Sequence, residues 1–99
     1  MNVYFSATAI RALDKIYLWY KLQRLTKIGK NKRAAIIKKS KLLKDNPYIG
    51  QMEEQLEHLN QDHRYLVEGE HKIIYRIENQ NVIITDVFDT RQDPEKMKP

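Results

Sequence analysis

Three runs in the second half of the chain decide the fold: His63-Arg64-Tyr65-Leu66-Val67, His71-Lys72-Ile73-Ile74-Tyr75-Arg76-Ile77 and Val82-Ile83-Ile84-Thr85-Asp86-Val87-Phe88. Each run is rich in β-branched and aromatic residues, and only a few polar residues separate one run from the next. This spacing is typical of consecutive antiparallel strands joined by short turns. The sequence therefore predicts a three-stranded antiparallel meander, closed by Asp89-Thr90-Arg91.

The chain before this meander predicts a strand and a first helix. Val3-Tyr4-Phe5 is a short β-type run, and Ser6 is a good N-cap for a helix from Ala7 to about Gln23. Leu18 and Trp19 lie off the apolar stripe of this helix, so they either cover another element or form part of a partner surface, and we favour cover for another element. The stripe itself is expected to build the core through Ile10, Leu13, Ile16, Tyr17 and Tyr20.

A second helix and a turn are predicted next. Gly29 interrupts the helical pattern, and Asn31 is expected to cap a helix that runs to about Lys44. Asp45-Asn46-Pro47 ends this helix, because the residue before a proline is pushed out of the α region. Residues 51–62 are polar, and we expect an irregular connection with some extended character.

These elements predict an α+β fold in the order β-α-α-β-β-β, with a helical hairpin packed on the sheet. A chain of 99 residues is expected to form a single domain over residues 1–99. The last residues, 93–99, are expected to be flexible or to be ordered by a partner. The sequence thus indicates one small domain with a tail.

Several classes of protein lack their necessary residues here. The chain has no cysteine and no long apolar segment, so we expect a cytoplasmic protein that does not contact a membrane. It has no phosphate-binding or dinucleotide-binding glycine motif and no nucleophile elbow, so we expect no cofactor. The histidines and glutamates lack metal-ligand spacing, so we expect no metal site.

Charge divides the chain into two unequal halves. Residues 1–49 hold twelve basic and two acidic residues, a net charge of +10, whereas residues 50–99 hold six basic and eleven acidic residues, a net charge of −5. From Lys15 to Lys44 there are eleven Lys or Arg and no acid. Such a field attracts polyanions, which include nucleic acids and acidic protein segments. Lysines on the solvated faces of two helices would give the same pattern.

The order of these elements and their local residues resembles the RelE/ParE superfamily of type II toxin–antitoxin toxins, which are often described as plasmid-stabilisation proteins. The resemblance covers nearly the full length. It rests on the opening strand with Ser6 and Ala9, the helical hairpin, Asn46-Pro47-Tyr48-Ile49-Gly50, the two strands around Arg64-Tyr65-Leu66 and Lys72-Ile73-Ile74-Tyr75-Arg76-Ile77, and Val87-Phe88-Asp89-Thr90-Arg91-Gln92-Asp93-Pro94.

The resemblance implies a toxin that is neutralised by an antitoxin with an acidic or amphipathic segment. RelE-like members are mRNA interferases, endoribonucleases that cut mRNA in the ribosomal A site, whereas ParE-like members poison DNA gyrase on the same fold. Fold alone does not choose between the two. Our sequence-based preference is ribosome-dependent mRNA cleavage through RNA binding, with gyrase inhibition, or a toxin that has lost nuclease activity, as the alternatives.

RNA cleavage by the 2′-hydroxyl needs a base, cations that stabilise the phosphate, and an acid for the leaving oxygen. Lys72 takes the place that resembles the family's phosphate-stabilising strand arginine. By strand alternation Arg76 faces the same way, and Arg91 resembles the basic position after the last strand. His63 is the best acid/base candidate, because its ordinary pKa lies near neutrality. We expect Lys72, Arg76 and Arg91 to lie together and exposed.

Two further residues are candidates for contact with the substrate. Tyr65 matches a position where the nuclease branch places a basic residue, and Arg64 corresponds to an arginine common in this strand. For Arg64 a structural ion pair is an equal alternative.

The chain also departs from the nuclease pattern. RNA-cleaving relatives commonly carry a tyrosine or a histidine–tyrosine pair near the C-terminus, and this chain has neither beyond His71 and Tyr75. Glu53, Glu54 and Glu57 could supply a carboxylate base in place of that pair, but an exposed acidic loop is the simpler interpretation.

Overall fold

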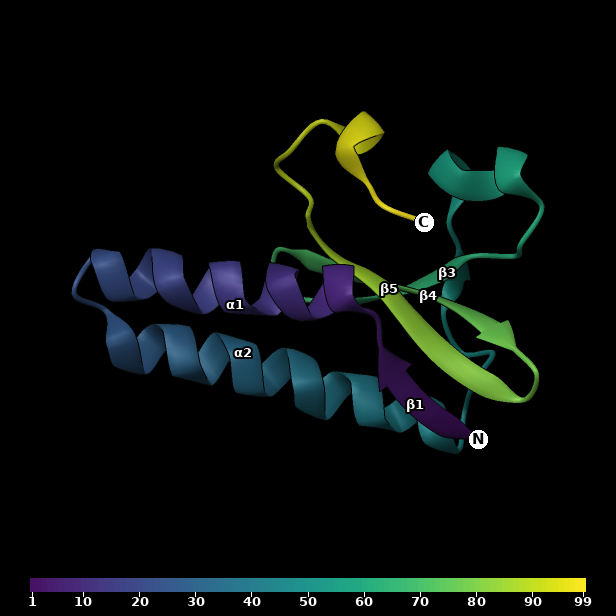
Figure 1. The fold of residues 1–99 in the computed structure, drawn as a ribbon, viewed down its shortest axis with the longest axis horizontal. Coiled ribbons are helices and arrows are strands. Elements are labelled where there is room, and N and C mark those ends of the chain that lie inside the picture. The colour runs from purple at the N-terminus through teal and green to yellow at the C-terminus, as the bar shows by residue number, and fades with distance from the viewer.

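The computed structural model describes residues 1–99 and shows two helices packed on one face of a five-stranded sheet with strand order β1-β5-β4-β3-β2 (Figure 1). The strands and helices are β1 (Asn2–Phe5), α1 (Ala7–Leu22), α2 (Thr26–Ser40), β2 (Gln51–Met52), β3 (Arg64–Glu68), β4 (His71–Glu78) and β5 (Asn81–Asp89). Three short 3₁₀ turns complete the chain: η1 (Lys41–Lys44), η2 (Glu54–Leu59) and η3 (Pro94–Lys96). The predicted α+β fold is confirmed.

The predicted meander forms the centre of the sheet. β3, β4 and β5 pair antiparallel in sequence order, and Asn79 and Gln80 both have positive φ in the tight turn that joins β4 to β5. β1 adds to β5 in parallel at one edge, and the helical hairpin crosses the sheet from β1 to β2 at the other edge. β2 supplies the opposite edge through two residues of the 51–62 connection, which is extended there and then forms η2.

α1 begins where the sequence predicted, because the hydroxyl oxygen of Ser6 accepts a hydrogen bond of 3.1 Å from the backbone N–H of Ala9. The predicted start of the second helix was wrong: α2 begins at Thr26 and contains Gly29. A Cβ atom on Gly29 would lie 2.8 Å from the Cβ of Tyr20, so the two helices approach closely at this glycine. Gly29 is therefore a helix-packing residue and does not break the helix.

The main core lies between the helices and the sheet. Its fully buried members come from both layers: Ala9, Leu13, Ile36, Leu43, Leu66, Ile73, Tyr75, Val82, Ile84 and Val87. The stripe predicted for α1 is only partly correct, because Ile10 is 45% exposed. Of the two alternatives for Leu18 and Trp19, the favoured cover of another element is wrong, since the two residues are 50% and 57% exposed.

A second, smaller cluster lies on the other face of the sheet. Leu56 of η2 and Met97 of the C-terminal segment cover Ile74 and Phe88 there. The backbone N–H of Lys98 also donates to the carboxylate of Asp86 across 3.0 Å. The segment 93–99, expected to be flexible or partner-ordered, thus packs on the chain's own sheet, and Figure 1 shows it beside the η2 segment. Neither α1 nor α2 has the length and apolar character needed to cross a bilayer.

Candidate functional site

The orientation predicted for β4 is confirmed. Ile73 and Tyr75 belong to the main core under the helices, whereas Ile74 belongs to the cluster on the opposite face. Because side chains alternate along a strand, Lys72 and Arg76 share the face of Ile74. This face is partly covered by η2 and by the C-terminal segment, so the two cations lie on a surface that is less open than the sequence predicted.

Lys72 is engaged by other residues of this face. Its Nζ donates to the Glu53 carboxylate across 2.9 Å and lies 4.1 Å from the centre of the Tyr65 ring. The side chain of Glu53 is only 5% exposed, so the expected exposed acidic loop is wrong for this residue. The reason is strand pairing, because the N–H of Glu53 donates to the carbonyl of His63 and draws the carboxylate onto the sheet.

His63 is enclosed. Its side chain is 2% exposed, and neither ring nitrogen has a hydrogen-bond partner. Burial lowers the pKa of His63, the charge of Arg76 lowers it further, and only Glu53 acts in the opposite direction. The imidazole is thus held neutral and away from solvent, which is an unfavourable position for exchanging protons with a polymeric substrate.

Arg76 and Arg91 each have an acidic partner close in sequence. Arg76 donates to Glu78 across 2.7 Å, and Arg91 donates to both carboxylate oxygens of Asp89, at 3.0 and 2.7 Å. This contact with Arg91 lowers the pKa of Asp89 to about 2.

Arg91 does not join Lys72 and Arg76. The chain turns after β5, and Arg91 lines a groove with Trp19 and Tyr20 of α1, beside the end of β5 and the C-terminal segment. The expectation that the three cations lie together and exposed therefore does not hold for Arg91. The side chains of Lys72 and Arg76 are 25% and 26% exposed, against 69% for Arg91.

Arg64 and Tyr75 hold the Asn46–Gly50 turn. Arg64 donates to the carbonyls of Tyr48 and Gly50, at 3.2 and 2.9 Å, and its guanidinium lies over the Tyr48 ring. The Tyr75 hydroxyl donates to the carbonyl of Pro47 and accepts from the N–H of Gly50. These contacts favour the structural alternative for Arg64, although the partners are carbonyls and no ion pair forms.

Tyr65 has the remaining contacts among the predicted site residues. Its hydroxyl donates to the side-chain oxygen of Gln51 across 3.0 Å, on the β2 edge of the sheet. Its ring packs partly against the smaller cluster, and the ammonium group of Lys72 lies over the ring in a cation–π contact. A role in RNA cleavage for Tyr65 and its neighbours stays a prediction.

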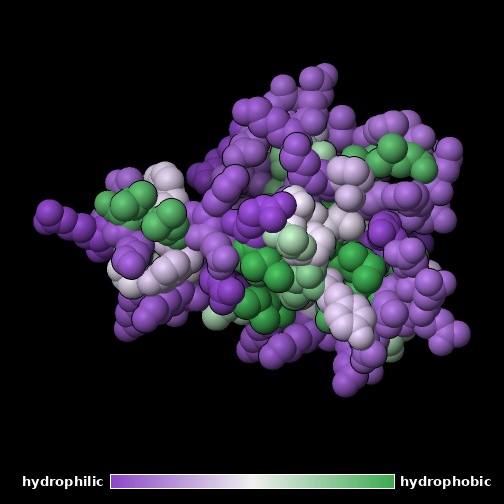
Figure 2. All heavy atoms as spheres, in the orientation of Figure 1, coloured by the Kyte–Doolittle hydropathy of each residue, from purple (hydrophilic) through white to green (hydrophobic).

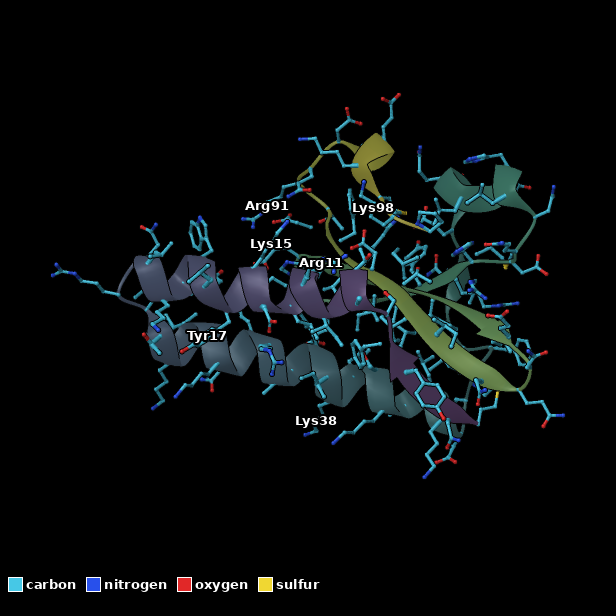
Figure 3. All side chains as sticks on the ribbon, viewed as in Figure 1. Arg11, Lys15, Tyr17, Lys38, Arg91 and Lys98 are labelled. Atoms are coloured by element: carbon cyan, nitrogen blue, oxygen red, sulfur yellow. The ribbon has the colours of Figure 1, made fainter.

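Arg91 lines a groove on the surface of the protein. Its volume is about 900 Å³, and it lies between α1, the second half of β5 and the C-terminal segment. Five cations line it: Arg11, Lys15, Arg91, Lys96 and Lys98. Figure 3 shows Arg11, Lys15, Arg91 and Lys98 on the same side of α1, whereas Tyr17 and Lys38 lie on the other side. We name this surface the α1–β5 groove.

The α1–β5 groove was not predicted from the sequence. The i, i+4 spacing of Arg11 and Lys15 on one side of the first helix was the available signal. The sequence holds no signal that would place the cations near the C-terminus in the groove, because their position depends on how residues 93–99 pack on the sheet.

The floor of the α1–β5 groove includes an unpaired strand edge. β1 pairs with β5 only as far as Ile84, where the N–H of Ser6 donates to the Ile84 carbonyl across 2.9 Å. From Asp86 to Asp89, β5 pairs with β4 alone. Burial raises the pKa of Asp86, the acid beside this edge. A strand edge among cations is a surface that can bind an extended acidic peptide.

No three His, Asp or Glu side chains come together in an arrangement that could hold a metal ion.

Comparison with known proteins assigns the family. The model of the family described as "ParE toxin of type II toxin-antitoxin system, parDE" matches residues 3–94. A solved structure described as "Chromosomal ParDE TA system from P. aeruginosa" superposes with a TM-score of 0.75 and 16% identity, over 90% of this chain and 95% of that chain. At this identity the likeness shows the fold alone. No curated protein matches. Because the family model covers nearly the whole chain, the protein belongs to the ParE toxin family of type II toxin–antitoxin systems.

Proposed function

We propose that this toxin acts by binding DNA gyrase without cleaving RNA, and that an antitoxin holds it inactive through the α1–β5 groove. The sequence alone favoured mRNA cleavage. The burial of His63 reverses that preference, because the best acid/base candidate is enclosed and its pKa is lowered. This single observation carries the choice.

The other groups needed for RNA cleavage support the same choice. Lys72 is paired with Glu53, and Arg76 is paired with Glu78. A phosphate that replaced either carboxylate would leave that carboxylate without its partner, and for Glu53 this means a buried charge. Arg91 lies in another region of the surface. The cations on the β4 face thus stabilise the fold, and this proposal assigns them no chemical step.

The α1–β5 groove suits an antitoxin segment in charge and in shape. It holds five cations and two acids, and because Arg91 and Asp89 neutralise each other, four cations remain against Asp86. The unpaired edge from Asp86 to Asp89 offers backbone groups to one added strand. An acidic extended segment would satisfy both features when it orders on binding.

The experiment compares two assays of the purified toxin. We expect inhibition of plasmid supercoiling by gyrase, with intact mRNA in a reconstituted translation reaction at the same toxin concentration. The matched control is toxin that has been preincubated with its antitoxin, which is expected to restore supercoiling. Cleavage of mRNA that requires ribosomes, with normal supercoiling, would overturn the proposal in favour of the nuclease.

A further inference from the structure

The end of the helical hairpin exposes a cluster of large apolar side chains. Its members are Leu18, Trp19, Leu22, Leu25 and Ile28, which are 50%, 57%, 72%, 41% and 43% exposed. They lie in the last turns of α1, in the connection and in the first turn of α2. Figure 1 shows that this end projects beyond the sheet, and Figure 2 shows apolar atoms gathered there. We name these five residues the hairpin patch.

The fold does not use the hairpin patch. None of its residues belongs to either buried cluster or packs against one. The two helices contact each other directly beside the patch, where Gly29 lets α2 approach Tyr20. Large apolar groups gathered at one exposed end, outside both buried clusters, indicate a surface that binds a partner.

The charges around the hairpin patch define the chemistry of that partner. Lys21, Arg24 and Lys27 lie between the apolar residues, within a stretch from Lys15 to Lys44 that contains no acid. An apolar centre with a rim of cations fits an acidic protein surface with an apolar centre. A second copy of the chain does not fit, because two such ends would bring like charges together.

We propose that the hairpin patch is the surface by which the toxin docks on an acidic surface of DNA gyrase; this rests on the gyrase target proposed above. The antitoxin site is a separate surface, since the α1–β5 groove is lined by Trp19 but by no other residue of the patch. Trp19 is the point where the two surfaces meet. An antitoxin in the groove would therefore cover one side of the patch and block gyrase sterically.

The test replaces Leu22, the most exposed residue of the patch. In Leu22→Glu toxin, the concentration needed for half-inhibition of supercoiling is expected to rise by about tenfold or more, because a charge at the centre of an interface is costly to bury. Antitoxin affinity is expected to stay within about twofold of the wild-type value. The control is Leu42→Glu, at a leucine that is 48% exposed in η1, at the other end of α2. It is expected to inhibit gyrase as the wild type does.

Each other outcome has its own meaning. Equal inhibition by wild-type and Leu22→Glu toxin would overturn the hairpin patch and leave the gyrase target standing. Parallel loss of antitoxin affinity in Leu22→Glu would assign the patch to the antitoxin and overturn the proposal. Leu22-dependent binding to anionic phosphatidylglycerol vesicles, with unchanged gyrase inhibition, would assign it to a lipid surface. A wild-type toxin that does not affect gyrase would overturn the proposed function itself.

Discussion

The ammonium group of Lys72 donates to the carboxylate of Glu53 across 2.9 Å, on the face of the sheet that is turned away from the helices. Glu53 is nearly fully buried, and Lys72 is its only charged partner within salt-bridge distance. The pair joins the residue that follows β2 to β4, the central strand of the meander. It also explains why a lysine in the position of a catalytic cation can have a structural role.

Replacing Lys72 by methionine tests this role. We expect Lys72→Met to lower the free energy of unfolding by about 1–3 kcal/mol, because it leaves a buried carboxylate unpaired. Adding Glu53→Gln is expected to recover part of the loss. Urea denaturation measures both variants, with Lys38→Met, at an exposed lysine without an ion pair, as the control. A Lys72→Met protein as stable as the control would contradict the structural role.

The Tyr75 hydroxyl is expected to stabilise the Asn46–Gly50 turn. Tyr75→Phe removes its bonds to Pro47 and Gly50 and leaves a buried N–H without its partner. We expect a loss of about 1–3 kcal/mol in the free energy of unfolding. Tyr48→Phe is the control, because Tyr48 is 62% exposed. Equal stability of the two variants would show that the turn does not depend on this hydroxyl.

The buried histidines predict a dependence of stability on pH. Burial lowers the pKa of both His63 and His71, so the folded protein takes up these protons at a lower pH than the unfolded chain does. Stability is thus full above about pH 6.5 and falls as the pH decreases below it, by up to about 1.4 kcal/mol per pH unit for each histidine.

His63→Leu removes one of these protonation sites. Urea denaturation between pH 7.5 and pH 5 is expected to show a shallower loss of stability than in the wild type. His58→Gln, at an exposed histidine, is the control. An unchanged slope in His63→Leu would mean that solvent reaches this ring in the folded protein.

The α1–β5 groove predicts which cations the antitoxin contacts. Lys15→Glu reverses a charge within the groove, and we expect it to weaken antitoxin binding by about tenfold or more. Lys38→Glu makes the same charge change on the other side of the helical hairpin and is expected to have little effect. Isothermal titration at two salt concentrations measures both. If both variants weaken antitoxin binding equally, the effect depends on the net charge of the toxin and not on the groove.

Local pattern predicted most of the fold. The alternation of apolar and polar residues in β4 correctly placed Ile73 and Tyr75 on the core side, and Ser6 correctly marked the start of α1. Gly29 was misjudged because a glycine that ends a helix and a glycine at a helix crossing have the same local signature. Only the proximity of Tyr20, nine residues earlier in the chain, distinguishes them.

The site was less predictable, because burial depends on segments that are remote in sequence. Nothing local shows that η2 covers part of the meander face or that Glu53 and His63 are buried. Arg91 was expected beside Lys72 because it resembles the family's basic position after the last strand. The chain after Asp89 instead places Arg91 in the groove beside α1, and strand alternation does not predict the path of a turn.

The most direct measurement titrates the toxin against a fixed amount of gyrase and follows plasmid supercoiling. If the toxin inhibits by binding, gyrase supercoiling activity is expected to fall to its lowest level at about equimolar toxin, and longer incubation is expected to leave the extent of inhibition unchanged. Folded Arg76→Met toxin is expected to inhibit gyrase as the wild type does. The contrary result is undiminished supercoiling together with ribosome-dependent cleavage of mRNA by the wild-type toxin, with that cleavage abolished in Arg76→Met. It would contradict inhibition of gyrase by binding.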